Sequence, residues 1–306
     1  MSTLIAPLAR PEPLPDTTPA SADDDRPALA CQRRGDGPLV VCLHSSTGSQ
    51  GQWRALGDRL ADRAEVLTPD LYGHGRSPAW PAGVASTLDV DAGAVMSLAR
   101  AQRPGLAREG LHLVGHSYGA AVALRIALRH PQLVRSLTVY EPVLVGLLAP
   151  EAGAPVDPAL DEIRDIARSV AALVRAGELA TAAQVFVAYW GGAGAWHAMS
   201  EVQQATIVHR IPTIPRHFDA LFAARADNRL WQRLQMPVWL LHGSATRASA
   251  RAVAERLATL LPCVQREQIA GAGHLGPITH AAAVADAMAL PLAASLAAGA
   301  GCETAA

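Results

Sequence analysis

The sequence predicts an α/β protein in which a mostly parallel sheet is covered by helices on both faces. Short apolar strands alternate with helical patterns, and such alternation favours parallel strands joined by helical crossovers. Between residues 146 and 229 the alternation stops, and only helical patterns such as ALDEIRDIARSVAALVRAG remain. We therefore expect a core formed by residues 28–145 and 230–306, with an all-helical cap at 146–229 over the carboxyl-terminal edge of the sheet.

The individual elements follow from local patterns. The stretch LVVCL at 39–43 is continuously apolar, as expected of a strand that is buried on both faces. Turn-forming strings such as RGDGP separate the elements. The expected strands are 29–33, 39–43, 65–68, 111–115, 134–140, 238–242 and 264–269. The expected core helices are 52–63, 87–102, 120–129, 248–261 and 280–290.

Composition excludes several classes of protein. The chain has 306 residues and no lysine, and its 26 arginines face 27 acidic residues. With a net charge of −1, the protein lacks the positive electrostatic field that nucleic-acid-binding proteins use. The apolar share of 50% argues against disorder in bulk. Residues 1–27 are rich in Pro, Ala and Asp, and we expect them to form a disordered tail.

Location and assembly are predicted more coarsely. No stretch reaches the ~18 uninterrupted apolar residues of a membrane span, and the first residues do not resemble a secretory signal. The cysteines are scattered without metal-binding spacing, which indicates four reduced thiols, at positions 31, 42, 263 and 302. We expect a cytoplasmic monomer or homodimer that acts on a small molecule, with no nucleic-acid or membrane partner.

The strongest chemical signal is Gly115-His116-Ser117-Tyr118-Gly119, which lies between a predicted strand and a predicted helix. A serine on such a tight turn projects its hydroxyl above the sheet, and the turn requires small residues two positions before and after it. The amino terminus of the helix places partial positive charge where an anion would develop. Ser117 is therefore the candidate nucleophile.

A serine nucleophile needs a base, and the candidate is His274. It follows the last predicted strand in the glycine-bearing loop GAGHLG. His116, beside the serine, is expected to point elsewhere, and His242 at a strand end is a weaker candidate. Five further histidines lie in or at the ends of predicted helices and strands, where a structural role is expected: His112, His130, His209, His217 and His280.

Four segments together resemble the α/β-hydrolase superfamily in its serine-nucleophile branch. They are GHSYG, the late GAGH, DLYGHGRS at 70–77 and LHSSTGSQGQW at 43–53, and the resemblance covers about residues 28–290. It implies an eight-stranded sheet, a nucleophile elbow, an oxyanion hole and a Ser–acid–His triad, with no metal or cofactor. Serine at the elbow argues against the haloalkane dehalogenase and epoxide hydrolase branches, which use aspartate. The DLYGHGRS turn, with Asp70, matches an architectural feature of the family.

The oxyanion hole departs from the family pattern. The first oxyanion segment usually ends in His-Gly, but here it reads His44-Ser45-Ser46. Carried over by position, the two donors are the backbone N–H groups of Ser46 and Tyr118. Ser45 in place of glycine leaves less room for the backbone to approach a bound oxyanion. His44 is interpreted as a structural residue below this loop.

The position of the triad acid departs further from the family pattern. No Asp or Glu follows the strand 238–242, where the family most often places it, until Glu255 within a helix. Glu141, directly after the strand 134–140 and before Pro142, fits the alternative position in related branches. It would hold the tautomer of His274 and stabilise its charged form. Asp219 and Asp227, late in the helical stretch, are the alternative candidates for the acid. If Glu141 has no catalytic role, the expected structural role is a salt bridge with an arginine.

The sequence gives the least information on the substrate and on the residues that bind it. Aromatic residues of the helical stretch could line an apolar acyl pocket or simply pack between cap and sheet. The candidates for substrate binding are Tyr189, Trp190 and Trp196, with Phe186 and Met199 nearby. The leading hypothesis is a serine hydrolase of a small to medium apolar ester or related acyl compound. The alternatives are a C–C bond hydrolase on the same triad and a non-catalytic ligand-binding protein. Because every basic residue is arginine, no arginine stands out as a substrate ligand.

Overall fold

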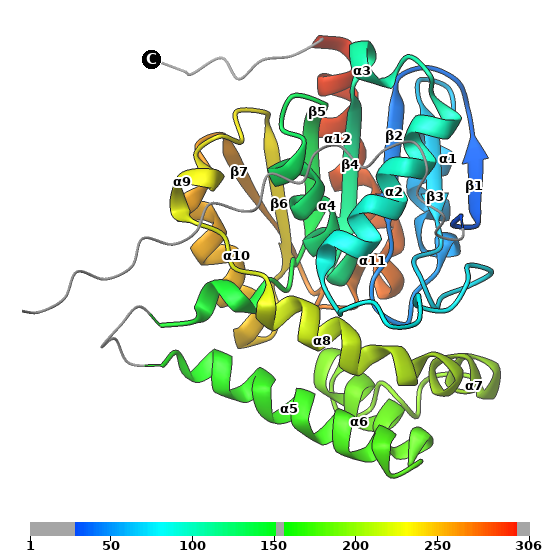
Figure 1. Ribbon diagram of the computed structural model, residues 1–306, viewed down its shortest axis with the longest axis vertical. Coiled ribbons are helices and arrows are strands. Elements are labelled where there is room, and N and C mark those ends of the chain that lie inside the picture. The colour runs from blue at the N-terminus through cyan, green and yellow to red at the C-terminus, as the bar shows by residue number, and fades with distance from the viewer. Residues whose placement is uncertain (1–27, 151–155, 299–306) are drawn as a thin grey trace, which may run out of the picture.

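A single seven-stranded sheet organises the part of the chain that the computed structural model describes, residues 28–150 and 156–298. The strand order is β1-β3-β2-β4-β5-β6-β7; β1 runs antiparallel to β3 and all other neighbours are parallel (Figure 1). The strands are β1 (Cys31–Arg34), β2 (Leu39–Leu43), β3 (Glu65–Pro69), β4 (Leu111–His116), β5 (Val134–Tyr140), β6 (Val238–Gly243) and β7 (Val264–Ile269). The described residues thus hold the seven strands expected from the patterns, rather than the eight that the resemblance implied.

Helices cover both faces of this sheet because its central strands are apolar on both sides. In β2, Val41 and Leu43 face one layer, whereas Val40 and Cys42 face the other. The first layer holds α2 (Leu88–Gln102), α4 (Tyr118–Arg129) and α10 (Ala248–Leu260), and the second holds α1 (Arg54–Leu60) and α12 (Ala281–Ala298). Short turns complete the core: η1 (Gln50–Trp53), α3 (Leu106–Glu109) and α11 (Gly276–Thr279).

The last helix differs from its predicted length. We expected it to stop at residue 290, before Pro291, but α12 continues to Ala298 with the proline inside it. Proline removes one helical hydrogen bond and normally interrupts a helix. Here Met288 and Leu292, on either side of it, are fully buried against the sheet, and this packing offsets the lost bond.

A run of helices between β5 and β6, which we name the helical insertion, lies along one end of the sheet except for its last short helix, which lies beside the sheet (Figure 1). Local signals start its helices: the Asp157 side chain accepts a hydrogen bond from the Ala159 N–H, and Ser200 forms a capping box with Gln203. The elements are η2 (Val145–Leu148), α5 (Pro158–Arg175), α6 (Leu179–Gly191), α7 (Glu201–Arg210), η3 (Ile211–Thr213), α8 (Ile214–Ala223) and α9 (Asn228–Trp231).

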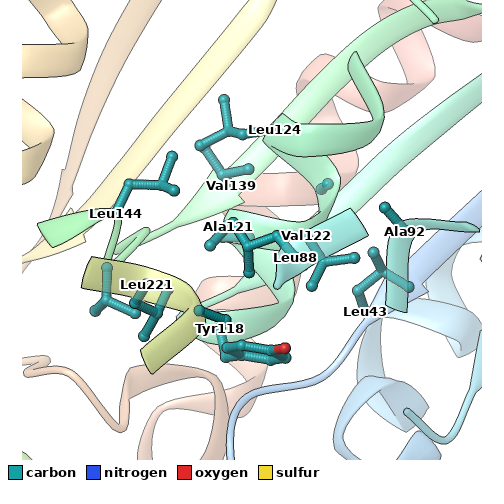
Figure 2. Packing of buried hydrophobic residues seen from close by; sticks show 14 of the residues in the cluster. Leu43, Leu88, Ala92, Tyr118, Ala121, Val122, Leu124, Val139, Leu144 and Leu221 are labelled. Carbon is teal, nitrogen blue, oxygen red and sulfur yellow. The ribbon is translucent and has the colours of Figure 1, made fainter. Parts of the chain in front are cut away.

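The start of α4 is embedded in the apolar core. Val122 of α4 packs in the same cluster as Leu88 of α2, while Tyr118, the first residue of α4, lies beside Leu221 of the helical insertion (Figure 2). The insertion and the core therefore meet at the point where β4 turns into α4.

Two other expectations concern cysteines and termini. Cys31 and Cys42 are free thiols, but Cys263 forms a disulfide, so the prediction of four reduced thiols is wrong at Cys263. Cys302 and the expected tail at residues 1–27 lie outside the described residues. No helix within the described ranges is both long enough and apolar enough to cross a bilayer.

Candidate active site

Ser117 lies on a strained turn between β4 and α4. Its backbone has φ +56°, a region that non-glycine residues rarely adopt. The flanking glycines are required by contact: a Cβ on Gly115 would lie 2.5 Å from the Cα of Ala120, and one on Gly119 would lie 2.3 Å from the Leu43 carbonyl oxygen. The turn therefore brings the end of β2 against the start of α4 and lifts Ser117 above the sheet.

The structure brings Ser117, His274 and Glu141 together, although they are far apart in the sequence. The Nε2 atom of His274 lies 2.9 Å from the Ser117 Oγ atom, and its Nδ1 atom lies 2.8 Å from Glu141 Oε2. The three residues are buried, with exposed fractions of 5%, 2% and 0%. This is the geometry in which a histidine can take a proton from a serine while a carboxylate fixes its tautomer.

The carboxylate of Glu141 is held from two sides. Besides His274, it accepts a hydrogen bond from the Gly243 N–H, at 2.8 Å from Oε1. Burial alone raises the pKa of Glu141, but the hydrogen bond and charge of His274 and the Gly243 N–H outweigh it, so the pKa lies below its ordinary value. Glu141 is therefore an ionised carboxylate at neutral pH.

Backbone strain is concentrated at this site. Among the described residues, three non-glycine residues have positive φ: Ser117, Glu141 at +42° and Thr47 at +62°. Thr47 belongs to the loop after β2, residues 44–49, which we name the oxyanion loop. Strained backbone persists where the surrounding structure enforces it, and it is frequent at functional sites.

The oxyanion loop carries Ser46, and Tyr118 opens α4 beside it. Neither backbone N–H donates a hydrogen bond to any of the described residues, and Tyr118, as the first residue of a helix, has no partner within the helix. Both amides are therefore available for a bound oxyanion.

Two buried histidines hold this loop. His44 Nε2 accepts from the Leu71 N–H at 3.0 Å and Nδ1 bonds to the Ser45 carbonyl, while His74 Nε2 accepts from the Thr47 N–H at 3.2 Å. Burial lowers the pKa of His44 to about 4 and that of His74 to about 3, so both are neutral and able to accept. The expected structural role of His44 agrees with these contacts.

Asp70 also supports the loop and its neighbouring turn. Its Oδ1 atom accepts from the Gln50 N–H at 2.8 Å, and its Oδ2 atom accepts from the Arg76 N–H at 3.1 Å. Both partners are backbone amides of adjoining turns, which is consistent with the architectural role that the sequence indicated.

A polar chain that is not evident from the sequence joins the oxyanion loop to the loop after β7 that carries His274. Gln52 Oε1 accepts from the N–H and the hydroxyl of Ser45, and its Nε2 atom lies 3.2 Å from His116 Nδ1. His116 Nε2 lies 2.8 Å from the carbonyl oxygen of His274. If Gln52 donates to Nδ1, His116 donates from Nε2, and every member has a compatible partner. Gln52 lies within the LHSSTGSQGQW segment, but its contacts with His116 and Ser45 become visible only in the folded chain.

The helical insertion contributes Trp190 and His217. The indole ring of Trp190 stacks on the His274 imidazole with the ring centroids 3.9 Å apart. His217 of α8 stacks on Tyr118 at 3.6 Å, and its Nδ1 atom lies 2.7 Å from Ser46 Oγ. From its place within a helix, the sequence predicts only a structural role for His217.

A small cavity of about 10 Å³ lies above Ser117. The Ser117 hydroxyl shares it with Ser46, His217 and a set of apolar side chains: Val143, Phe186, Trp190, Ile214, Phe218 and Leu221. Of the three expected substrate-binding residues, Trp190 lines this cavity. The Tyr189 hydroxyl instead bonds to Ser249, 2.7 Å away, and Trp196 packs at the edge of the core without lining the cavity.

The alternative acids lie away from His274. Asp219 is exposed and borders a second, larger cavity of about 380 Å³ beside α5 and α8. Asp227 caps α9, accepting a hydrogen bond from the Arg229 N–H at 2.8 Å. Glu141 is thus the acid that the structure places on His274. Across the described ranges, no group of three His, Cys, Asp or Glu side chains is arranged to hold a metal ion.

A mostly parallel sheet with a strained serine turn after β4 and a histidine after the last strand defines an α/β hydrolase. Residues 38–281 match the family of the alpha/beta hydrolase fold, and the chain belongs to this family.

Individual relatives match over shorter stretches. Lipase LipV of Mycobacterium tuberculosis is 36% identical over 118 residues, 38% of this chain and 42% of the lipase. The 2-(acetamidomethylene)succinate hydrolase of Mesorhizobium japonicum is 32% identical over 121 residues, 39% of this chain and 41% of that enzyme. The chain thus spans about two fifths of the length of these curated relatives. A thermophilic esterase from Thermogutta terrifontis has the same fold, with a TM-score of 0.70 and 23% identity over 87% of this chain and 93% of the esterase.

Proposed function

We propose that this chain is a serine hydrolase of small to medium, fairly apolar esters or related acyl compounds. One observation carries the proposal: Ser117 Oγ, His274 Nε2, His274 Nδ1 and Glu141 Oε2 form a continuous hydrogen-bonded chain with contacts of 2.9 and 2.8 Å. Three groups of these types in this order make a nucleophile, its base and the group that orients the base.

The reaction proceeds through an acyl-enzyme. Ser117 Oγ attacks the substrate carbonyl while His274 Nε2 takes its proton and then gives it to the leaving alcohol. In the second half, His274 takes a proton from a water molecule that attacks the acyl carbon, and it then returns the proton to Ser117 Oγ as the bond to the acyl group breaks and the acid leaves. Glu141 stays ionised throughout and stabilises the charged imidazole that forms in both halves.

The negative charge of each tetrahedral intermediate falls on the former carbonyl oxygen. The free N–H groups of Ser46 and Tyr118 are the proposed donors for this oxygen. In acyl-transferring enzymes, loss of one such donor costs about 10²–10³ in turnover. The α4 amino terminus adds its partial positive charge at the same place.

The apolar walls of the small cavity support the substrate class. Phe186, Trp190 and Phe218 surround the approach to Ser117, and we propose that the helical insertion acts as a cap over it. A volume of about 10 Å³ holds about one water molecule, so a substrate enters as side chains of the cap move. Relatives named as a lipase and an esterase are consistent with ester cleavage.

Labelling with a fluorophosphonate probe, followed by hydrolysis of p-nitrophenyl esters of increasing acyl length, tests the proposal. We expect labelling of the wild type at Ser117, no labelling of Ser117→Ala, and the fastest turnover with short acyl chains. Folded protein that is not labelled would contradict the enzyme assignment and favour a ligand-binding role. Labelling without cleavage of any ester would instead favour C–C bond hydrolysis.

A further inference from the structure

His217 is the polar side chain that the helical insertion places beside both proposed oxyanion donors. Its ring lies parallel to that of Tyr118, with an angle of 4° and centroids 3.6 Å apart. Its Nδ1 atom contacts the Ser46 hydroxyl at 2.7 Å, a contact between residues 171 positions apart. The mechanism proposed above assigns no step to this histidine.

The second ring nitrogen of His217 has no partner. The residue is 1% exposed, and its Nε2 atom makes no hydrogen bond within the described part of the chain. A buried polar atom without a partner is costly, and buried nitrogens are nearly always bonded. His217 borders the same small cavity as the Ser117 hydroxyl, so a bound molecule is the natural partner of Nε2.

The contact with Ser46 is compatible with one assignment of the ring proton. At 2.7 Å the Ser46 hydroxyl is within donating distance of Nδ1. We assign the hydroxyl as the donor, which places the hydrogen of the neutral ring on Nε2. The ring is neutral, because burial and the neighbouring His74 and His44 lower the pKa of His217 well below its ordinary value.

We propose that the Nε2–H of His217 binds a second oxygen atom of the substrate, on the carbon next to the scissile carbonyl or one position further. The substrate class is then a short ester with an alkoxy, hydroxy or oxo group close to the reacting carbonyl. The cavity shared by Ser117 and His217 has the volume of about one water molecule, so a carbonyl placed for attack leaves room for only a few atoms before His217. This inference rests on the proposed esterase activity.

The experiment compares two isosteric esters, p-nitrophenyl methoxyacetate and p-nitrophenyl butanoate, which differ by an oxygen in place of a methylene. The measured quantity is the ratio of their kcat/KM values, divided by the ratio of their rates with hydroxide. His217→Asn keeps an amide near the position of Nδ1 but lacks Nε2, whereas His217→Gln places an amide nitrogen near Nε2. His209→Asn makes the same change at an exposed histidine of α7 and is the matched control.

We expect the corrected ratio to fall about three- to tenfold in His217→Asn, as for one lost neutral hydrogen bond, to be largely kept in His217→Gln and to be unchanged in His209→Asn. Thermal unfolding of each variant, and its labelling by a fluorophosphonate, show that the protein is folded and its serine reactive. An unchanged ratio in His217→Asn, or an equal fall in His209→Asn, overturns the inference while the esterase assignment stands. If the wild type cleaves neither ester, the proposed function fails, and the inference fails with it.

Discussion

Glu141 and Gly243 are joined across two neighbouring strand ends by a 2.8 Å hydrogen bond from the Gly243 N–H to Glu141 Oε1. Gly243 is the last residue of β6, after which the family most often places its acid, and Glu141 directly follows β5. The two strands are adjacent and parallel, with Tyr140 opposite Leu241. An acid from the end of β5 therefore reaches the same histidine that an acid after β6 would reach.

The first prediction concerns Glu141. Replacing it with glutamine keeps the shape of the side chain but removes the charge that stabilises the imidazolium, and the amide favours the wrong tautomer of His274. We expect kcat for a p-nitrophenyl ester to fall by about 10²–10⁴-fold, as for other triads that lose their acid. Steady-state kinetics measure the effect, and circular dichroism checks the fold.

Asp227→Asn and Asp219→Asn are the matched controls for Glu141→Gln. Asp227 is an exposed helix cap and Asp219 an exposed residue of α8, so neither change should alter kcat by more than about twofold. A large loss of kcat in either control, with normal activity in Glu141→Gln, would refute our assignment of the acid.

The parts of the site that could be predicted from sequence are those with local signals. Ser117 lies in a strand–turn–helix motif whose glycines are required by close backbone contacts, and His274 follows the last strand in a loop. Glu141 depends on the family resemblance, which implies the end of β5 as an alternative position for the acid when the segment after β6 holds none. Sequence patterns also predicted all seven observed strands: the central ones, such as β2, are short apolar runs, whereas the edge strands β1 and β7 are mostly polar.

The remaining parts depend on contacts between distant segments. His217 reaches Ser46 only because α8 folds back over the oxyanion loop, and Gln52 gains its role from His116, 64 positions away. Tyr189 was grouped with Trp190 as an aromatic neighbour, but successive residues on a helix point in different directions, so its hydroxyl meets Ser249 instead. The eighth strand was carried over from the family and had no pattern of its own in this chain.

The second prediction concerns Gln52, which connects Ser45 to His116. Gln52→Leu removes the acceptor for the Ser45 N–H and the partner of His116 Nδ1, so both loops lose a fixed contact. We expect kcat to fall about tenfold with little change in KM, because the loss concerns positioning of the reacting groups. Gln235→Leu, at an exposed glutamine whose side chain bonds only to the Gln232 carbonyl, should leave kcat unchanged. Equal effects in both variants would contradict a positioning role.

The third prediction concerns Arg210, which ties the helical insertion to the oxyanion loop. Its Nη1 atom donates to the carbonyl oxygens of Thr47 and Gly48, at 2.6 and 2.8 Å, next to the strained φ of Thr47. Hydrogen bonds from charged groups contribute about 1.5–3 kcal/mol. Removing the guanidinium group should therefore take away part of this energy from the stabilisation of the transition state. We expect Arg210→Gln to lower kcat/KM about three- to thirtyfold.

Arg216→Gln is the control for Arg210→Gln, because Arg216 is exposed on α8 and makes no hydrogen bond or ion pair within the described residues. Kinetics with the same ester and the rate of fluorophosphonate labelling measure both variants. If Arg210→Gln labels and turns over like Arg216→Gln, the link from the insertion to the oxyanion loop has no catalytic consequence.

The last prediction uses Asp91, a buried carboxyl group of α2 behind the elbow, whose Oδ2 atom accepts a hydrogen bond from the Tyr118 hydroxyl at 2.8 Å. Burial raises its pKa from 3.8 to about 6, against the effect of the Tyr118 hydrogen bond. A raised pKa means that the folded state favours the protonated form, so this stabilisation is complete below pH 3.8 and is lost as the pH rises through about 6.

In the Asp91→Asn variant this dependence disappears, because the amide does not titrate. We expect the free energy of unfolding of the wild type, relative to that of Asp91→Asn, to decrease by about 2–3 kcal/mol between pH 4 and pH 7.5, since one pKa unit corresponds to about 1.4 kcal/mol. Urea unfolding at several pH values measures this change in the free energy of unfolding.

Asp89→Asn gives a control of opposite sign. Burial raises the pKa of Asp89, but ion pairs with Arg125 and Arg129 outweigh this and hold it below its ordinary value, so its contribution is lost as the pH falls. A stability difference for Asp91→Asn that does not change with pH would show that the carboxyl group titrates normally despite its burial.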